Sequence, residues 1–249
     1  MFSARHFIWL GVLGAIIAVL LVFIKKKNVS GKIISKTVLF ALVALKVFHL
    51  CLSMKESEFG GYVIDQSQLS FHLCSVMIYA VVLINVIKNE KFVTVMKSFM
   101  VPCMLIGAAM ALLIPTAGVE FTKPRVWEFM LAHGTLVFYG VYLMIIEKVD
   151  LSLKVFFTNL KLLLALVMLA FLMNSVLEQY ETNFMFLRKP PMDDLPILNL
   201  NNGWHVYFIT LAFIACALLF SVHLPFVIKN MRAKKKAAKS AAEKIPVAK

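Results

Sequence analysis

Long apolar stretches recur along the chain and are separated by short polar segments. A hydrocarbon layer about 30 Å thick asks for roughly 20 apolar residues in each spanning helix, and seven stretches approach this length. They cover residues 6–24, 36–54, 70–87, 95–114, 126–146, 153–176 and 204–228. The pattern predicts an all-α fold, a polytopic membrane bundle of seven transmembrane helices within residues 1–228.

Two of these stretches carry features that bear on the prediction. Three lysines, Lys25, Lys26 and Lys27, follow the first stretch where a cleavable signal peptide would show small residues. We therefore interpret it as a spanning helix. The fourth stretch contains Pro102 and Gly107, which membrane helices tolerate where neighbouring groups satisfy the freed backbone.

Lysine and arginine residues are distributed unequally between the two sets of loops. One set, together with the C-terminal tail, holds 18 of them: Lys25, Lys26, Lys27, Lys32, Lys36, Lys88, Lys91, Lys97, Lys148, Lys154, Lys229, Arg232, Lys234, Lys235, Lys236, Lys239, Lys244 and Lys249. The opposite set holds six: Arg5, Lys55, Lys123, Arg125, Arg188 and Lys189. Because basic residues are retained on the cytoplasmic side, we expect the N-terminus outside and the C-terminus in the cytoplasm.

The composition agrees with a multi-pass integral protein of the cell membrane, since 61% of the 249 residues are hydrophobic and 16% are charged. The net charge of +13 is spread over membrane-flanking loops, so no nucleic-acid partner is expected. The tail 229–249 is a polybasic run that we expect to be disordered and close to the lipid surface. The sequence contains no P-loop, GxGxxG or HExxH motif, and we expect neither a cofactor nor a metal.

The polar side chains inside the predicted helices gather at one depth. At 1.5 Å of rise per residue, Cys74 lies roughly 6 Å and His133 roughly 10 Å below the outer ends of their helices. Other polar residues fall near the same level: Lys46, His49, Glu128, Asn174, Glu178 and His205. The inner halves are almost wholly apolar, apart from Asn85, Asn159 and Lys161. Because ionisable groups at membrane depth usually face a bundle interior or a water-filled cavity, the pattern predicts a polar cavity open to the outer face.

Cys74 and His133 are the candidate catalytic pair in this layer. A cysteine and a histidine make a nucleophile when the imidazole takes the thiol proton and later returns it to a leaving group. His72 lies two residues before Cys74 and so should face the other side of the helix, beside the second or seventh helix or the lipid interface. The alternative is that such residues only bridge helices or extend to the interface. Cys51, Cys103 and Cys216 are interpreted as small packing residues.

The candidate substrate-binding residues are Lys46, His49, His72, Glu128, Asn183, Arg188 and His205. Lys46 and His49 lie three residues apart on one helix face and can supply positive charge to an oxyanion or a lipid phosphate. Arg188 and Lys189 belong to the long loop between the last two helices, where they can bind a phosphate or carboxylate. An ion pair with Asp193 or Asp194 is the alternative for Arg188 and Lys189.

Three motifs also carry a resemblance: SFHLCSV at residues 70–76, RVWEFMLAHG at 125–134 and NFMFLRKPP at 183–191. Over residues 36–225 the chain resembles the YwaF-like family of bacterial integral membrane proteins, which includes the eukaryotic transmembrane protein 164. That eukaryotic relative is described as a phospholipid acyltransferase with a membrane cysteine as nucleophile and a histidine partner. By motif, the resemblance implies these roles for Cys74 and His133.

Two functions of different classes remain open on the sequence. One is a cysteine-dependent phospholipid acyltransferase or lipid hydrolase, with membrane lipids as partners and a phospholipid or lysophospholipid as substrate. The other is a binding or transport protein that holds an anionic ligand through Lys46, His49, Arg188 and His205. Short broken half-helices typical of secondary transporters are not obvious, which favours the first reading.

Overall fold

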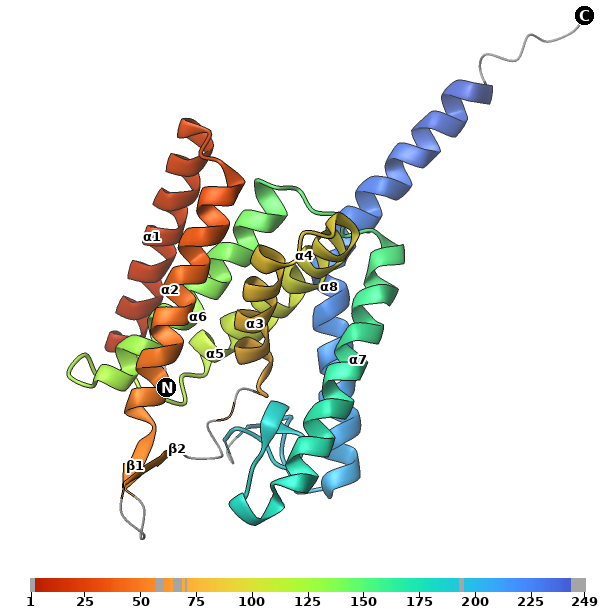
Figure 1. Cartoon of the computed structure of the whole chain (residues 1–249). Helices are drawn as coiled ribbons and strands as arrows, with labels where there is room; N and C mark the ends of the chain where they lie inside the picture. Colours follow the sequence, from red (N-terminus) through yellow and green to blue (C-terminus); the bar gives the residue numbers. More distant parts are fainter. Residues whose placement is uncertain (1–2, 57–60, 65–68, 70, 193–194, 243–249) are drawn as a thin grey trace, which may run out of the picture.

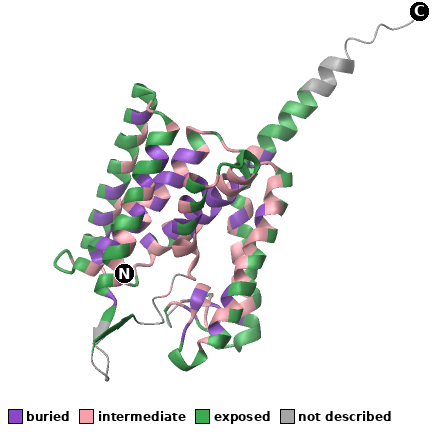
Figure 2. Cartoon of the chain, in the orientation of Figure 1, coloured by how far each residue is buried: buried purple, intermediate pink, exposed green. Residues whose placement is uncertain are grey.

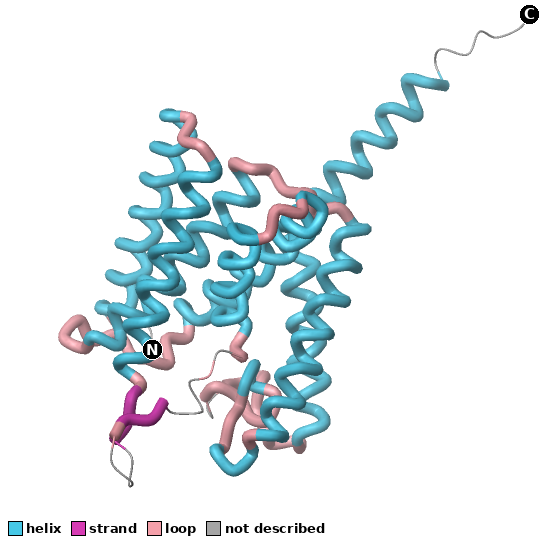
Figure 3. The backbone as a smooth tube through the Cα atoms, in the orientation of Figure 1, coloured by secondary structure: helices cyan, strands magenta, loops and turns pink. Residues whose placement is uncertain are grey.

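The protein is a bundle of helices in the computed structural model, which describes residues 3–56, 61–64, 69, 71–192 and 195–242 (Figure 1). Two long helices come first, α1 (Ala4–Lys27) and α2 (Gly31–Leu52), followed by a small antiparallel hairpin of β1 (Met54–Glu56) and β2 (Tyr62–Ile64). The remaining elements are α3 (Leu73–Val86), α4 (Glu90–Cys103), the π-helix η2 (Met104–Ala108), α5 (Ala109–Leu113), α6 (Pro124–Ile145), α7 (Leu153–Val176), the short 3₁₀ turns η3 (Glu178–Tyr180) and η4 (Phe184–Phe186), and α8 (Trp204–Ala242). Helices dominate the chain, and loops lie at the two ends of the bundle (Figure 3).

Local residue choices explain where several helices begin and end. The Ser3 side chain accepts a hydrogen bond from the backbone of α1, and the Asn89 side chain does the same for α4. Pro124 occupies the first turn of α6, where its missing N–H is not needed. Asn28 ends α1 in the left-handed conformation with φ 49°, after three lysines that suit the negative end of the helix dipole.

The centre of the bundle is formed by α6 and the α4–η2–α5 helix. In the most apolar stretch of each helix, 56% of the residues are buried for α6 and 50% for Glu90–Leu113, against 11–17% for α1, α2, α7 and α8. Buried positions accordingly concentrate on the inner helices in Figure 2, while the outer helices present exposed residues. The main core cluster includes fully buried side chains from five elements: Leu42, Met77, Met100, Met104 and Leu136. The exposed apolar faces of α1, α2, α7 and α8 therefore suit contact with lipid.

The prediction of an all-α membrane bundle is confirmed, with one difference in the third helix. Within the described residues, six helices are long and apolar enough to cross a membrane, and α3 is shorter, at 14 residues. At 1.5 Å per residue α3 spans about 21 Å, less than a hydrocarbon layer. The expected stretch 70–87 is shortened because His72 is an extended N-cap and Ile87 is extended at the other end. Ser70 lies outside the described residues.

The last helix differs in the opposite way, because α8 continues beyond residue 228 to Ala242. The tail expected to be disordered is therefore helical up to this point. Alanine and lysine, which dominate this segment, are among the strong helix formers. Residues 243–249 lie outside the described residues.

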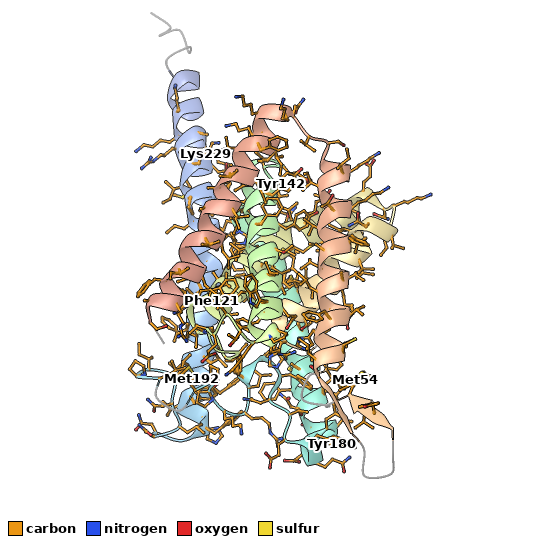
Figure 4. The ribbon with its side chains drawn as sticks, turned by 90° about the vertical axis from the view of Figure 1, so that its left-hand side faces the viewer. Met54, Phe121, Tyr142, Tyr180, Met192 and Lys229 are labelled. Carbon is orange, nitrogen blue, oxygen red and sulfur yellow. The ribbon has the colours of Figure 1, made fainter. Side chains whose placement is uncertain are left out.

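The two chain ends lie at opposite ends of the bundle (Figure 1). Figure 4 shows Met54, Tyr180 and Met192 towards one end and Tyr142 and Lys229 towards the other. We call the end where α1 begins and α2 and α7 finish the outer end, following the orientation expected from the lysine and arginine distribution. The opposite end is the inner end.

The inner end is more polar than the sequence indicated. His223 and Asn159 are both fully buried, and Asn159 Nδ2 lies 3.2 Å from His223 Nε2. His223 Nδ1 donates to the carbonyl of Leu151 at 3.0 Å, so Nε2 is the accepting nitrogen. Lys97 pairs with Glu147 at 2.5 Å. Asn159 was an expected exception at this end, but the expectation of otherwise apolar inner halves was wrong because it left out His223, which is buried beside Asn159.

A second inner-end network links α2, α3 and α6 through neutral side chains. Asn85 donates to Ser35 Oγ at 2.9 Å, and the Tyr139 hydroxyl donates to the same oxygen at 3.0 Å. These hydrogen bonds satisfy polar groups inside an apolar bundle, where an unpaired group is costly.

Candidate functional site

The polar layer at the outer end is built from four helix ends. The last turns of α2 carry Lys46 and His49, and the first turns of α6 carry Arg125, Glu128 and, one turn deeper, His133. The start of α3 adds His72 and Cys74, and η4 follows the outer end of α7. These ends all lie in the lower half of the molecule in Figure 1. The helices thus bring together residues that are distant in sequence.

Glu128 is the buried carboxylate of this layer, with only 5% of its surface exposed. Its Oε2 lies 3.1 Å from His49 Nδ1 and 3.6 Å from Arg125 Nη1. Arg125 Nη1 also donates to Ser53 Oγ at 3.2 Å, and the Ser53 hydroxyl donates to the His49 carbonyl at 2.7 Å. A buried carboxylate needs such partners, because an unpaired charge in an apolar surrounding is very costly.

His49 Nδ1 has two neighbours that require different protonation states. It lies 2.9 Å from Arg125 Nη1, which can only donate, and 3.1 Å from Glu128 Oε2, which accepts. Nδ1 accepts from Arg125 when it carries no proton and donates to Glu128 when it carries one. The arrangement therefore allows two hydrogen-bonding patterns, which differ in whether His49 Nδ1 carries a hydrogen.

His133 lies on α6 with its ring orientation fixed by its own helix. Its Nδ1 donates to the Phe129 carbonyl at 2.7 Å, and the two rings are 4.2 Å apart between centroids. Since a carbonyl only accepts, Nδ1 carries the hydrogen and Nε2 is the nitrogen that can take a proton. His133 also lies close enough to Glu128 and His49 to interact with them electrostatically. This hydrogen bond fixes which ring nitrogen of His133 carries the hydrogen.

Cys74 lies in the first turn of α3 and packs against the π-helix η2. A β-carbon placed on Gly107 would come within 3.3 Å of Cys74 Sγ, so the absence of a side chain at Gly107 leaves the space that the thiol occupies. π-helical turns are frequent at functional sites. Within the described part of the chain no hydrogen bond joins Cys74 to His133. Catalytic contacts are often long before substrate binds.

The helices that carry the two residues pack against the same short segment. Cys74 contacts η2 from α3 at Gly107. Gly140 of α6 also faces η2, because a β-carbon there would lie 3.2 Å from Met104 and 3.3 Å from Leu105. His133 is seven residues before Gly140, nearly two helical turns, and so lies on the same side of α6 towards the outer end. Both α3 and α6 therefore pack against the π-helical segment.

His72 is positioned differently from the expectation based on helix periodicity. It is the N-cap of α3, in extended conformation with ψ 147°, so the 100° rotation between helical residues does not apply to it. Its ring contacts the rings of Phe184 and Phe186 of η4 at centroid distances of 5.7 and 5.3 Å. It also interacts electrostatically with Lys46 and His133.

The loop residues predicted to bind substrate have other contacts in the structure. Arg188 forms an ion pair with Glu178, and its proposed partners Asp193 and Asp194 lie outside the described residues. The Asn183 side chain accepts from the backbone N–H of Arg188 at 3.0 Å and donates to the Lys189 carbonyl at 2.8 Å. His205 is exposed at the start of α8, beside Trp204. These three residues are not joined to the Glu128 group.

Two residues of the layer were not predicted as site residues, Arg125 and Ser53. The RVWE stretch places Arg125 three residues before Glu128, a helical spacing that suits an ion pair and was available in the sequence. Ser53 follows α2 and carries no comparable sequence signal. Its contact with Arg125 depends on how α2 packs against α6.

A hollow of about 270 Å³ lies at the outer end of α7 and α8, lined by Phe171, Asn174, Ser175, Leu187, Arg188 and Trp204. Arg188, one of the predicted site residues, lines this hollow. The predicted outward-facing cavity around Cys74 and His133 remains a proposal. Among the residues that the structure describes, no group of three or more His, Cys, Asp or Glu side chains could hold a metal ion.

All four cysteines are free. Cys103 is buried in the main core, as expected for a packing residue, whereas Cys51 and Cys216 are exposed on the surfaces of α2 and α8. The interpretation of Cys51 and Cys216 as interior packing residues was therefore wrong. Their helices lie at the periphery, and the sequence alone did not indicate which face each would turn outward.

Comparisons with known proteins place the chain in a family. No match was found among curated proteins, and no solved structure matches the chain. The sequence model of the TMEM164 family matches residues 1–222. This range includes every helix before α8, the first part of α8 and all the candidate site residues. The chain belongs to the TMEM164 family.

Proposed function

We propose that the protein is a lipid acyltransferase or acyl hydrolase that uses Cys74 as nucleophile and His133 as general base. The observation that carries the proposal is the orientation of His133: its Nδ1 is committed to the Phe129 carbonyl, which leaves Nε2 free to take a proton in the layer where Cys74 lies. The packing of α3 and α6, which carry these two residues, against the same π-helical segment supports the pairing. The depth of this layer suits ester bonds of outer-leaflet lipids.

The chemistry follows from these roles. The Cys74 thiol proton passes to His133 Nε2 as Sγ attacks the ester carbonyl carbon of a lipid. The carbon–oxygen bond to the alcohol breaks, the alcohol takes the proton from His133, and a thioester remains on Cys74. An acceptor hydroxyl, from a lysolipid, then gives its proton to His133 and attacks the thioester. The carbon–sulfur bond breaks and the thiol recovers its proton; with water as acceptor the outcome is hydrolysis.

Positive charge near the pair suits the oxyanion that forms during both attacks. Lys46 is half-buried and interacts electrostatically with Glu128, Arg125 and His72. Among the described residues it forms neither an ion pair nor a hydrogen bond. Its ammonium group is therefore available for an oxyanion or a lipid phosphate, in a surrounding where charge interactions are stronger than in water.

Intact-protein mass spectrometry tests this proposal. Detergent-purified protein is incubated with phospholipids beside Cys74→Ser and His133→Ala variants. We expect a fatty-acyl mass increment on the parent that maps to Cys74, and a loss of that increment in both variants. An unmodified parent with unchanged lipids after long incubation, or a fully active Cys74→Ala variant, would overturn the proposal.

A second candidate function is binding or transport of an anionic ligand. It is favoured by the surplus positive charge at Lys46 and Arg125, which lie near the buried carboxylate of Glu128. It predicts thermal stabilisation by an anionic amphiphile that persists in Cys74→Ala and disappears in Lys46→Met. Arg188 and His205, also predicted for this function, have other surroundings.

A further inference from the structure

The segment Asn183–Arg188, which we call the cap, has a strained backbone. Met185 has φ 55° and Phe186 has φ 57°, so two consecutive bulky residues lie in the left-handed region. The left-handed conformation costs free energy for a residue with a Cβ, and it persists only where the surrounding structure fixes it. Strain of this kind gathers at sites where a particular geometry is needed.

Side chains from α7 and α8 hold the cap in this conformation. At its start, Asn174 of α7 forms two hydrogen bonds with the backbone of Phe184, accepting from its N–H at 2.7 Å and donating to its carbonyl at 3.1 Å. From α8, the Tyr207 hydroxyl donates to the Phe186 carbonyl, and Trp204 Nε1 donates to the Leu187 carbonyl at 2.9 Å.

Contacts within the loop complete this support. Asn183 bridges the two ends of the cap through the backbone of Arg188, and Arg188 pairs with Glu178 of η3. Phe184 is fully buried between the cap and α7. The conformation is therefore fixed from α7, from α8 and from the cap itself.

The cap extends from α7 and α8 to the start of α3, below the bundle in Figure 1. Phe184 and Phe186 both contact the His72 ring, and Phe184 also contacts Phe71 at a centroid distance of 5.1 Å. His72 is the N-cap of α3, two residues before Cys74. The aromatic rings of the cap thus lie on one side of His72, while Lys46 and His133 act on it electrostatically.

We propose that the cap is a preorganised support that holds the His72 ring at the start of α3, two residues before Cys74, and that Phe186 is a positioning residue acting through His72. This inference rests on the proposed acyl chemistry at Cys74. A fixed imidazole beside the nucleophile offers a donor or acceptor to the lipid ester or to the incoming hydroxyl. A displacement of about 1 Å at such a group costs on the order of a hundredfold in rate.

The test measures the rate of acyl loading on Cys74 by intact mass spectrometry in four proteins: the parent, Phe186→Ala, His72→Ala and the double variant. Phe186→Ala is expected to slow loading by about tenfold or more. If Phe186 acts through His72, the double variant loads no more slowly than His72→Ala alone. Phe213→Ala, the same substitution at an exposed ring of α8, is the matched control and is expected to load at the parental rate.

Further variants separate positioning from loss of folding. Phe186→Tyr keeps the ring and should restore loading, whereas Phe186→Leu keeps apolar volume without the ring contact and should not. Melting temperatures of all variants are measured in the same detergent. Parental loading in a folded Phe186→Ala protein, or additive losses in the double variant, would overturn the inference. Absence of loading in the parent would instead overturn the proposed function.

Discussion

At the residue scale, Pro102 removes a backbone donor inside α4, and a side chain from another helix replaces it. Proline has no N–H, so the Ser98 carbonyl four residues earlier lacks its helical partner. Asn159 Nδ2 of α7 donates to this carbonyl at 3.0 Å and also to His223 Nε2 of α8. One buried amide thus connects three helices at the inner end. Asn159 Oδ1 has no partner among the described residues.

Replacing Asn159 by leucine should therefore destabilise the protein. Two buried acceptors, the Ser98 carbonyl and His223 Nε2, lose their donor, and each unsatisfied group costs about 1–3 kcal/mol. We expect a clearly lower melting temperature in detergent. Thr158→Val is the control, because its hydroxyl only donates to the Lys154 carbonyl at 3.4 Å in the same helix. Equal melting temperatures for the Asn159→Leu and Thr158→Val proteins would contradict this account.

At the element scale, glycines determine how closely the central helices approach. Gly140 lies against the backbone-proximal Met104 Cβ and the Leu105 side chain, and Gly107 lies against Cys74 and Leu73. Small residues at such contacts allow helices in a membrane to pack through dispersion forces. The irregular path of the chain through Pro102 and η2 is accommodated at the same place. Close contacts at the π-helix therefore fix the distance between α3 and α6.

Gly140→Ala should separate α6 from η2 and destabilise the protein by about 1–3 kcal/mol, because the added carbon would lie 3.2 Å from Met104 Cβ. Gly14→Ala on α1 is the matched substitution. A β-carbon there meets nothing within 4 Å, so this variant should be neutral or up to about 1 kcal/mol more stable. Thermal unfolding of both variants in one detergent checks the difference. A Gly140→Ala protein with the parental melting temperature would contradict this prediction, because η2 would then move aside for the added carbon at no cost.

The element scale also shows which parts of the site were predictable. Cys74, His133, Lys46, His49 and Glu128 were assigned to one layer because rise per residue converts sequence position into depth. The argument used to place His72 was wrong, because it treated His72 as a helical residue, whereas His72 is the N-cap of α3. Arg188 was predicted to bind a ligand, and in the structure it forms an ion pair with Glu178. The depth of a residue follows from its position in one helix, whereas its contacts depend on how several helices pack.

At the scale of the whole molecule, polar groups are divided between the two ends of the bundle. The outer end holds the Glu128 group and the cap, and the inner end holds the Asn159 network and the Lys97–Glu147 pair. The apolar core cluster, with Leu42, Met77 and Leu136, occupies the space between them. Polar ends with an apolar middle suit a helical bundle that crosses a membrane.

The orientation of this molecule is a prediction that a labelling experiment can check. Because 18 basic residues flank the inner ends of the helices or lie in the tail and six flank the outer ends, we expect the C-terminal segment after residue 228 to face the cytoplasm. A periplasm-dependent reporter fused after Lys249 should be inactive, and a cytoplasm-dependent one should be active. The same reporters fused before Met1 should give the reverse result. Exchanged activities would show the inverted orientation.

The sequence by itself determined the helical class, the approximate limits of the long spans and the layer of ionisable residues near the outer end. These features are local, since spanning length, capping residues and depth depend on consecutive residues of one segment. Only the tertiary structure decided that Glu128 lies with His49 and Arg125, that Asn159 replaces the donor missing at Pro102, and that the cap reaches His72. Those contacts depend on the rotation and spacing of helices far apart in the chain, which packing in three dimensions sets.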